Sequence, residues 1–171
     1  MAIVNPQHLL EQAERLLEPR GSRPLIRQAD RRRAISSAYY AVFQFTVAAL
    51  ADEFIGKVER KTARYASAYR SIDHKPLANL CKKNSDPKTR DNLASYAPKS
   101  GFGPNIIEFA SLLAQLKEKR TAADYDPSYW LTIEDARQAI TDAHSAMERF
   151  EKASSERRRA LLAMLAFPPR T

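Results

Sequence analysis

The sequence predicts an all-α protein of four or five antiparallel helices that form one domain over residues 1–171. Apolar residues recur at helical spacing along several segments, whereas the alternation typical of strands is scarce. Alanine and leucine favour helices and are plentiful, while the chain has only four glycines. With 44% hydrophobic residues, a chain of this length can bury a core without disulfides or metals.

The first two helices are expected at residues 6–18 and 24–54. Asn5 suits the cap of the first helix and Pro6 its first position. The second helix has a broad apolar face that includes many small residues, so another helix can approach it closely. Residues 31–33 are three arginines that point in successive directions, so we expect at least one of them to reach a neighbouring segment or an anionic ligand.

The middle of the chain is expected to hold shorter helices at residues 60–70 and 76–83, followed by a basic loop at about 84–104. Asp-Pro, Ala-Pro, Ser-Gly and Gly-Pro steps predict that loop. Loops of this length are often functional or mobile.

Two further helices are expected at residues 105–120 and from Thr132 to about residue 166. Between them, Pro127 disfavours a helical conformation at Asp126, so residues 121–131 are expected to form a linker. Thr132 and Asp135 resemble a capping box. The C-terminal tail, about 151–171, is amphipathic in part and is expected to pack on the bundle or on a partner.

The composition of the chain predicts its cellular compartment and whether it binds a metal or a cofactor. A single cysteine, Cys81, excludes an internal disulfide framework and fits a reducing compartment. The apolar stretch 38–51 is short and interrupted by polar residues, and the N-terminus lacks a signal-peptide pattern. We therefore predict a cytoplasmic protein with no membrane association. The three histidines lie at no zinc-ligand spacing and no Gly-rich phosphate loop occurs, so we predict no metal and no cofactor.

The formal charge of +8 is concentrated in the middle third of the chain. Residues 61–120 carry twelve Lys and Arg against five Asp and Glu, a net charge of +7. Such an excess attracts polyanions, RNA first among them. On charge alone, a soluble protein with a lysine-rich loop explains the sequence equally well.

Two segments point to a more specific function. They are RRAISSAYYAVFQ at residues 32–44 and LKEKRTAADYD at residues 116–126. Together they resemble a branch of the HEPN family, in which a basic helix with an Ala-Tyr-Tyr-Ala core precedes a helix ending in Arg-x-x-Ala-Asp-Tyr. The resemblance implies an up-and-down four-helix bundle that forms a homodimer, with the arginine motifs of both subunits lining one cleft.

Many HEPN proteins are metal-independent ribonucleases in which four to six residues separate this arginine from a following histidine. The histidine moves a proton and the arginine neutralises charge on the phosphate. Here no histidine lies between His74 and His144, and Tyr125 stands at the shortest spacing from Arg120. A tyrosine with an ordinary pKa of about 10 is a poor base at neutral pH.

The resemblance assigns Arg120 to phosphate contact, Asp124 to orienting Arg120 and Tyr125 to stacking or hydrogen bonding. The further nucleic-acid-binding candidates are Arg32, Arg33, Tyr39, His74, Lys117 and Lys119. Simpler roles stand beside these: Arg120 and Asp124 form a surface ion pair, the tyrosine at 39 packs in the core, and the histidine at 74 caps or packs a helix.

Three functions remain open. The first is an RNA-associated ribonuclease toxin of a toxin–antitoxin or defence system, with a minimal nucleotidyltransferase as antitoxin partner that modifies Tyr125 or Tyr129. The second is a catalytically silent HEPN-like subunit that binds RNA or a nucleotide. The third is an unrelated helical adaptor, which would be a monomer without affinity for RNA.

Overall fold

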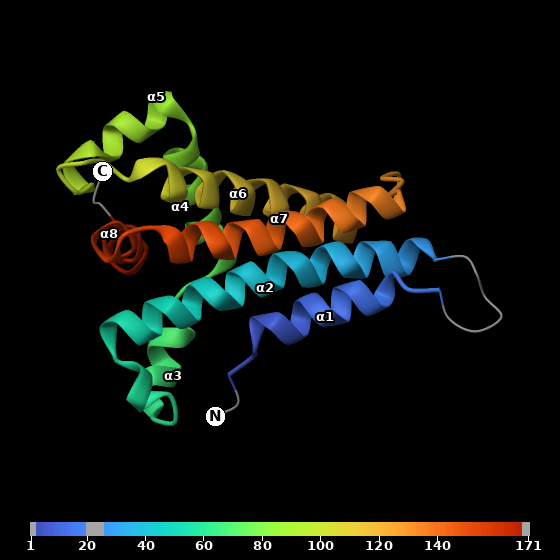
Figure 1. Ribbon diagram of the computed structural model, residues 1–171, viewed down its shortest axis with the longest axis horizontal. Helices are drawn as coiled ribbons and strands as arrows, with labels where there is room; N and C mark the ends of the chain where they lie inside the picture. The colour runs from blue at the N-terminus through green and yellow to red at the C-terminus, as the bar shows by residue number, and fades with distance from the viewer. Residues whose placement is uncertain (1–2, 20–25, 169–171) are drawn as a thin grey trace.

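The computed structural model describes residues 3–19 and 26–168, and every regular element in that part of the chain is helical. Four long helices lie side by side and run alternately in opposite directions (Figure 1): α1 (Pro6–Leu16), α2 (Gln28–Phe54), α6 (Gly103–Tyr125) and α7 (Ile133–Lys152). The predicted all-α class is confirmed. Likeness to the HEPN bundle in particular stays a prediction.

The rest of the described chain forms further, mostly shorter helices. They are η1 (Lys57–Glu59), α3 (Ala63–Tyr69), α4 (His74–Ser85), α5 (Pro87–Arg90), η2 (Asp91–Tyr96) and α8 (Ser155–Ala166). The expected loop at residues 84–104 is therefore largely helical, in short pieces. Helix α4 packs along α6 and begins beside α2, which brings its first residue into the region of the two motifs.

Helix α2 is the centre of the bundle and packs against α1, α3, α6 and α7. Its buried face includes Ile35, Tyr39 and Val42, which meet Phe109 and Leu113 of α6 in one continuous core. Within the described residues, α2 is also the one helix long and apolar enough to cross a membrane. Of that window, 72% is buried against the other helices, as in the core helix of a bundle.

Several helix ends agree with the predicted caps. The Asn5 side chain accepts a hydrogen bond from the Gln7 amide, and Thr132 and Asp135 form the reciprocal capping box. The predicted first two residues of the second helix, 24 and 25, lie outside the described residues.

Two predicted ends are wrong. Helix α6 continues past Arg120 to Tyr125, because Pro127 restricts only the residue before it and the helix can run up to that point. The expected single last helix is two helices, because Ser154 has an extended backbone and its hydroxyl caps α8 by accepting from the Arg157 amide. Helix α8 packs on the bundle itself and buries Leu161, Leu162, Met164 and Leu165.

Candidate functional site

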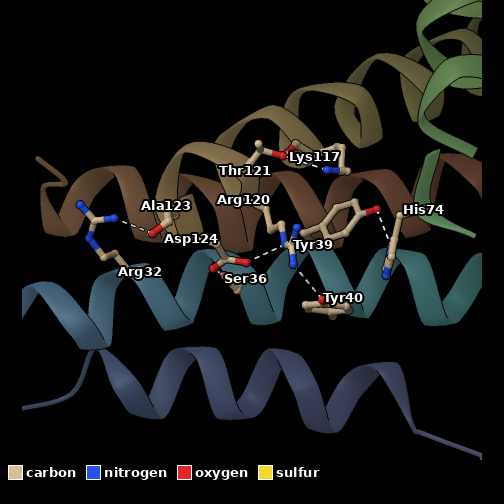
Figure 2. Close-up of polar contacts among 10 residues, drawn as sticks. All are labelled: Arg32, Ser36, Tyr39, Tyr40, His74, Lys117, Arg120, Thr121, Ala123 and Asp124. Atoms are coloured by element: carbon tan, nitrogen blue, oxygen red, sulfur yellow. Dashed lines mark hydrogen bonds and ion pairs between the residues drawn. The ribbon is translucent and has the colours of Figure 1, made fainter. Parts of the chain in front are cut away.

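The two motifs face each other where the C-terminal part of α6 packs against α2 (Figure 2). Because the helices are antiparallel, four residues forward on α2 correspond to four residues back on α6. Ser36 and Tyr40 on α2 therefore lie opposite Asp124 and Arg120 on α6. The two residues on each helix are about one helical turn apart, so all four side chains lie on the surfaces where the two helices face each other.

Arg120 has partners on both helices. Its Nε lies 2.7 Å from Asp124 Oδ2, and its Nη2 donates to the Tyr40 hydroxyl at 3.0 Å. The guanidinium carbon also lies 5.5 Å from the centre of the Tyr40 ring and 5.2 Å from that of Tyr125. Cations are attracted to aromatic faces at this range. The side chain is only 14% exposed, so the protein fixes this cation in one place.

Asp124 is in turn held by Ser36, whose hydroxyl donates to Oδ1 at 2.5 Å. The carboxylate is 23% exposed and therefore acts on Arg120 with little screening by water. Burial opposes the charge of Arg120, but Asp124, Tyr40 and Tyr125 together outweigh burial, and the pKa of Arg120 is raised. The predicted ion pair is present, and it is part of a network between helices rather than a surface pair.

A second group of polar side chains lies one turn further along the same face. The Tyr39 hydroxyl is 2.9 Å from Nδ1 of His74, which is the first residue of α4. The His74 ring also packs against the rings of Tyr40 and Phe43, at centroid distances of 5.3 and 3.9 Å. Lys117 Nζ lies 6.0 Å from the centre of the Tyr39 ring and donates to the Thr121 hydroxyl.

His74 is uncharged at neutral pH in this setting. Burial, followed by the positive charges of Arg120 and Lys117, lowers the pKa of its imidazole from the ordinary 6.5, and Asp73 only partly opposes this shift. Burial likewise raises the pKa of the Tyr39 hydroxyl, so it stays protonated. The two form a neutral pair beside two cations.

Arg32 is used by the protein itself. Its Nη1 donates to the carbonyls of Ala123 and Asp126, and its Nη2 to that of Tyr129. Carbonyl groups at a helix C-terminus lack hydrogen-bond donors within the helix, so Arg32 caps the end of α6. Arg33 is exposed and makes no polar contact with the described residues, and it remains available to a ligand.

Exposed aromatic side chains follow the Arg120 network. Tyr125, the last residue of α6, is 70% exposed, and Trp130, in the connection between α6 and α7, is 74% exposed. Tyr125 borders a shallow depression on α6, together with Lys117, Thr121 and Ala122. Glu118 and Asp126 line the same depression, so the surface beside the motif combines flat rings with charges of both signs.

Six of the predicted site residues lie together in the structure: Arg120, Asp124, Tyr125, Tyr39, His74 and Lys117. Lys119 lies apart from this group. Lys119 pairs with Asp142 of α7 at 2.8 Å. Sequence reasoning missed Ser36 and Tyr40 as parts of the network. Their four-residue spacing, which matches that of Arg120 and Asp124, was the available signal.

Within residues 3–19 and 26–168, no group of three or more His, Cys, Asp or Glu side chains is placed to hold a metal ion. No protein-family model, curated protein or solved structure matches the chain.

Proposed function

We propose that the chain is a HEPN-like, RNA-directed protein that acts as a homodimer and cleaves RNA without a metal at the Arg120 site. The observation that carries this proposal is the position of the Arg120 guanidinium. Asp124 and Tyr40 hold it in place beside the Lys117 ammonium and a neutral imidazole. A fixed cation next to a proton-accepting group suits phosphoryl transfer, where charge gathers on the phosphate oxygens as a proton is removed from the attacking oxygen.

The surrounding surface supports RNA as the polyanion. The chain carries a net charge of +8, and Arg33 is free to contact phosphates. The exposed rings of Tyr125 and Trp130 suit stacking on unpaired bases. Unpaired RNA offers both the bases and the 2′-hydroxyl that metal-free cleavage requires.

A toxin–antitoxin role with a minimal nucleotidyltransferase partner is part of the proposal. Tyr125 and Tyr129 are both exposed at the surface, as a tyrosine must be to enter another enzyme's active site. A nucleotide attached to Tyr125 would place a phosphate beside the Arg120 guanidinium, which lies over its ring. That phosphate would compete with RNA for the same cation.

A catalytically silent binding subunit is the second candidate, and one observation favours it. The Arg120 side chain already has partners in Asp124 and Tyr40 and is mostly buried, as in a structural network. A nuclease and a silent subunit both bind RNA, but only the nuclease produces fragments.

The proposal is tested by incubating the purified chain with unstructured RNA in EDTA and following binding and cleavage separately. Cleavage that Arg120→Ala abolishes supports the nuclease. Binding without cleavage supports the silent subunit, and neither binding nor dimerisation supports the unrelated adaptor.

A further inference from the structure

His74 occupies the position from which a proton carrier would serve the Arg120 site. Among the described residues, the other two histidines lie on α1 and α7, and His144 faces Glu14 rather than the motif. His74 comes from α4, 46 positions before Arg120 in the sequence, so no motif spacing reveals it. In Figure 2, Tyr39 and Tyr40 lie between Arg120 and His74.

Tyr40 connects the two groups directly. Its hydroxyl accepts from Arg120 Nη2 at 3.0 Å, while its ring lies edge-on to the imidazole of His74. Because Tyr40 contacts both side chains, the guanidinium of Arg120 and the imidazole of His74 lie about one aromatic ring apart. A phosphate with its ribose can span that separation. Lys117, from the adjacent turn of α6, adds a positive charge on the same side.

We propose that His74 is the general base of this site and that Tyr39 is its positioning residue. This inference rests on the nuclease function proposed above. The Tyr39 hydroxyl lies 2.9 Å from His74 Nδ1. We assign the proton to Nδ1, which donates to the hydroxyl oxygen and leaves the lone pair on Nε2. The hydrogen bond made by one ring nitrogen of a histidine sets the role of the other nitrogen.

The step balances without a metal or an external nucleophile. Nε2 of His74 takes the proton of a ribose 2′-hydroxyl, the 2′-oxygen bonds to the adjacent phosphorus, and the bond from phosphorus to the 5′-oxygen breaks. The departing oxygen takes a proton from water, and the imidazolium returns its proton to the hydroxide. The products are a 2′,3′-cyclic phosphate and a 5′-hydroxyl, with the Arg120 guanidinium neutralising charge on the phosphate.

Burial and the positive charges of Arg120 and Lys117 favour the basic, uncharged form of His74. Tyr39 and Tyr40 come from α2, Lys117 and Arg120 from α6, and only Asp73 before it favours protonation. A neutral imidazole is ready to accept a proton at pH 7, whereas an imidazolium is not.

The test compares His74→Gln with His144→Gln on a fluorescein-labelled unstructured RNA in EDTA, with the same oligonucleotide in 2′-deoxy form as a blank. We expect His74→Gln to slow cleavage by about 10²-fold or more, since general acid–base catalysis contributes about 10²–10⁴-fold. RNA affinity should change by less than about threefold, because His74 is uncharged and leaves the electrostatic attraction intact. His144→Gln should match the wild type.

Two further readouts separate catalysis from a structural role. The acid limb of the pH–rate profile should follow the pKa of His74 measured by NMR and disappear in His74→Gln. Nitrogen-15 shifts should show the proton on Nδ1, and Tyr39→Phe, which keeps the ring, should lose that preference and slow cleavage.

Cleavage by His74→Gln within about threefold of wild type would overturn this assignment and leave the nuclease function standing, since a general base contributes far more. A folded wild-type protein that binds RNA but does not cleave it would overturn both. If His74→Gln does not fold, an unchanged rate and tautomer in Tyr39→Phe would overturn the assignment instead.

Discussion

Tyr40 Oη accepts a hydrogen bond from Nη2 of Arg120 at 3.0 Å, although the two residues are 80 positions apart in the sequence. One turn back along α2, Ser36 donates to Asp124, which pairs with the same arginine. The two contacts fix the register of α2 against α6 and join the two motifs into one network. Five testable predictions follow from this arrangement and from the elements that support it.

Asp124→Asn should destabilise the fold by about 1.5–3 kcal/mol, because it removes a charged partner from a mostly buried arginine. Urea unfolding measures this loss. Glu118→Gln is the matched control on the same helix, since Glu118 is exposed and forms no ion pair with described residues. Equal stability of the two variants would show that the Arg120–Asp124 pair does not hold the helices together.

Arg32→Gln should destabilise by about 1–3 kcal/mol, because three main-chain carbonyls at the end of α6 lose a charged donor. The neighbouring Arg33→Gln should stay within about 0.5 kcal/mol of wild type, as exposed residues without contacts usually do. Urea unfolding of both variants checks this contrast. The reverse order would mean that the arginine at 33, not the one at 32, supports the fold.

Gly103→Ala should be more destabilising than Gly101→Ala. Both glycines have positive φ, at 72° and 70°, which costs an alanine about 1–2 kcal/mol. A Cβ at Gly103 would also come within 2.6 Å of Arg157 Cζ, whereas one at Gly101 would meet open space. Thermal unfolding measures the difference, and Arg157→Ala should reduce it. If the two alanine variants unfold together, Arg157 does not pack against this turn.

The Asp52 carboxylate should stabilise the protein at neutral pH and lose this effect in acid. Burial opposes its charge, but hydrogen bonds from Arg60 and Tyr65 outweigh burial and lower the pKa of Asp52. A lowered folded-state pKa means that the stabilisation is present above the unfolded value and vanishes as the pH falls through the folded one.

Asp52→Asn should therefore be clearly less stable than wild type at about pH 7, and the gap should narrow as the pH falls below the ordinary carboxyl pKa of about 4. Asp91→Asn, at an exposed position of η2, is the control and should cost little at either pH. A gap between Asp52→Asn and wild type that does not narrow in acid would contradict the role of the Asp52 charge.

Lys117→Gln should weaken RNA binding and reduce the slope of log affinity against log salt by about 1, as expected for the loss of one phosphate contact. Lys119→Gln should leave that slope unchanged, since this ammonium pairs with Asp142 of α7. Fluorescence anisotropy over a range of salt concentrations gives both slopes. A larger change for Lys119 than for Lys117 would place the RNA on another face.

Helical spacing and capping residues predicted most of the helices, because each of these patterns involves residues within about one helical turn. Spacing and caps located α1 and α7, with Asn5, Thr132 and Asp135 in the expected roles. The break before α8 was missed although Ser154 is a strong capping residue, since the charged run after it continues a helical pattern. The end of α6 was placed at Arg120 instead of at Tyr125, two residues before Pro127.

The site was predictable only in part, because its parts meet through tertiary packing. Arg120 and Asp124 share one helix, so their spacing predicted the ion pair. The contact of His74 with Tyr39 depends on how α4 begins beside α2, and no spacing rule encodes it. Arg32 looked like a phosphate ligand until the end of α6 was known. Its side chain meets carbonyls that only the folded chain brings near.

The central claim is that Arg120 makes this face a metal-free ribonuclease site. The most direct test is RNA cleavage in EDTA by wild type, Arg120→Ala and Arg137→Ala, an exposed arginine on α7, after each variant is shown to be folded. The account predicts fragments ending in 2′,3′-cyclic phosphate from wild type and Arg137→Ala, and none from Arg120→Ala. Equal cleavage by all three proteins, or by none of them, would contradict it.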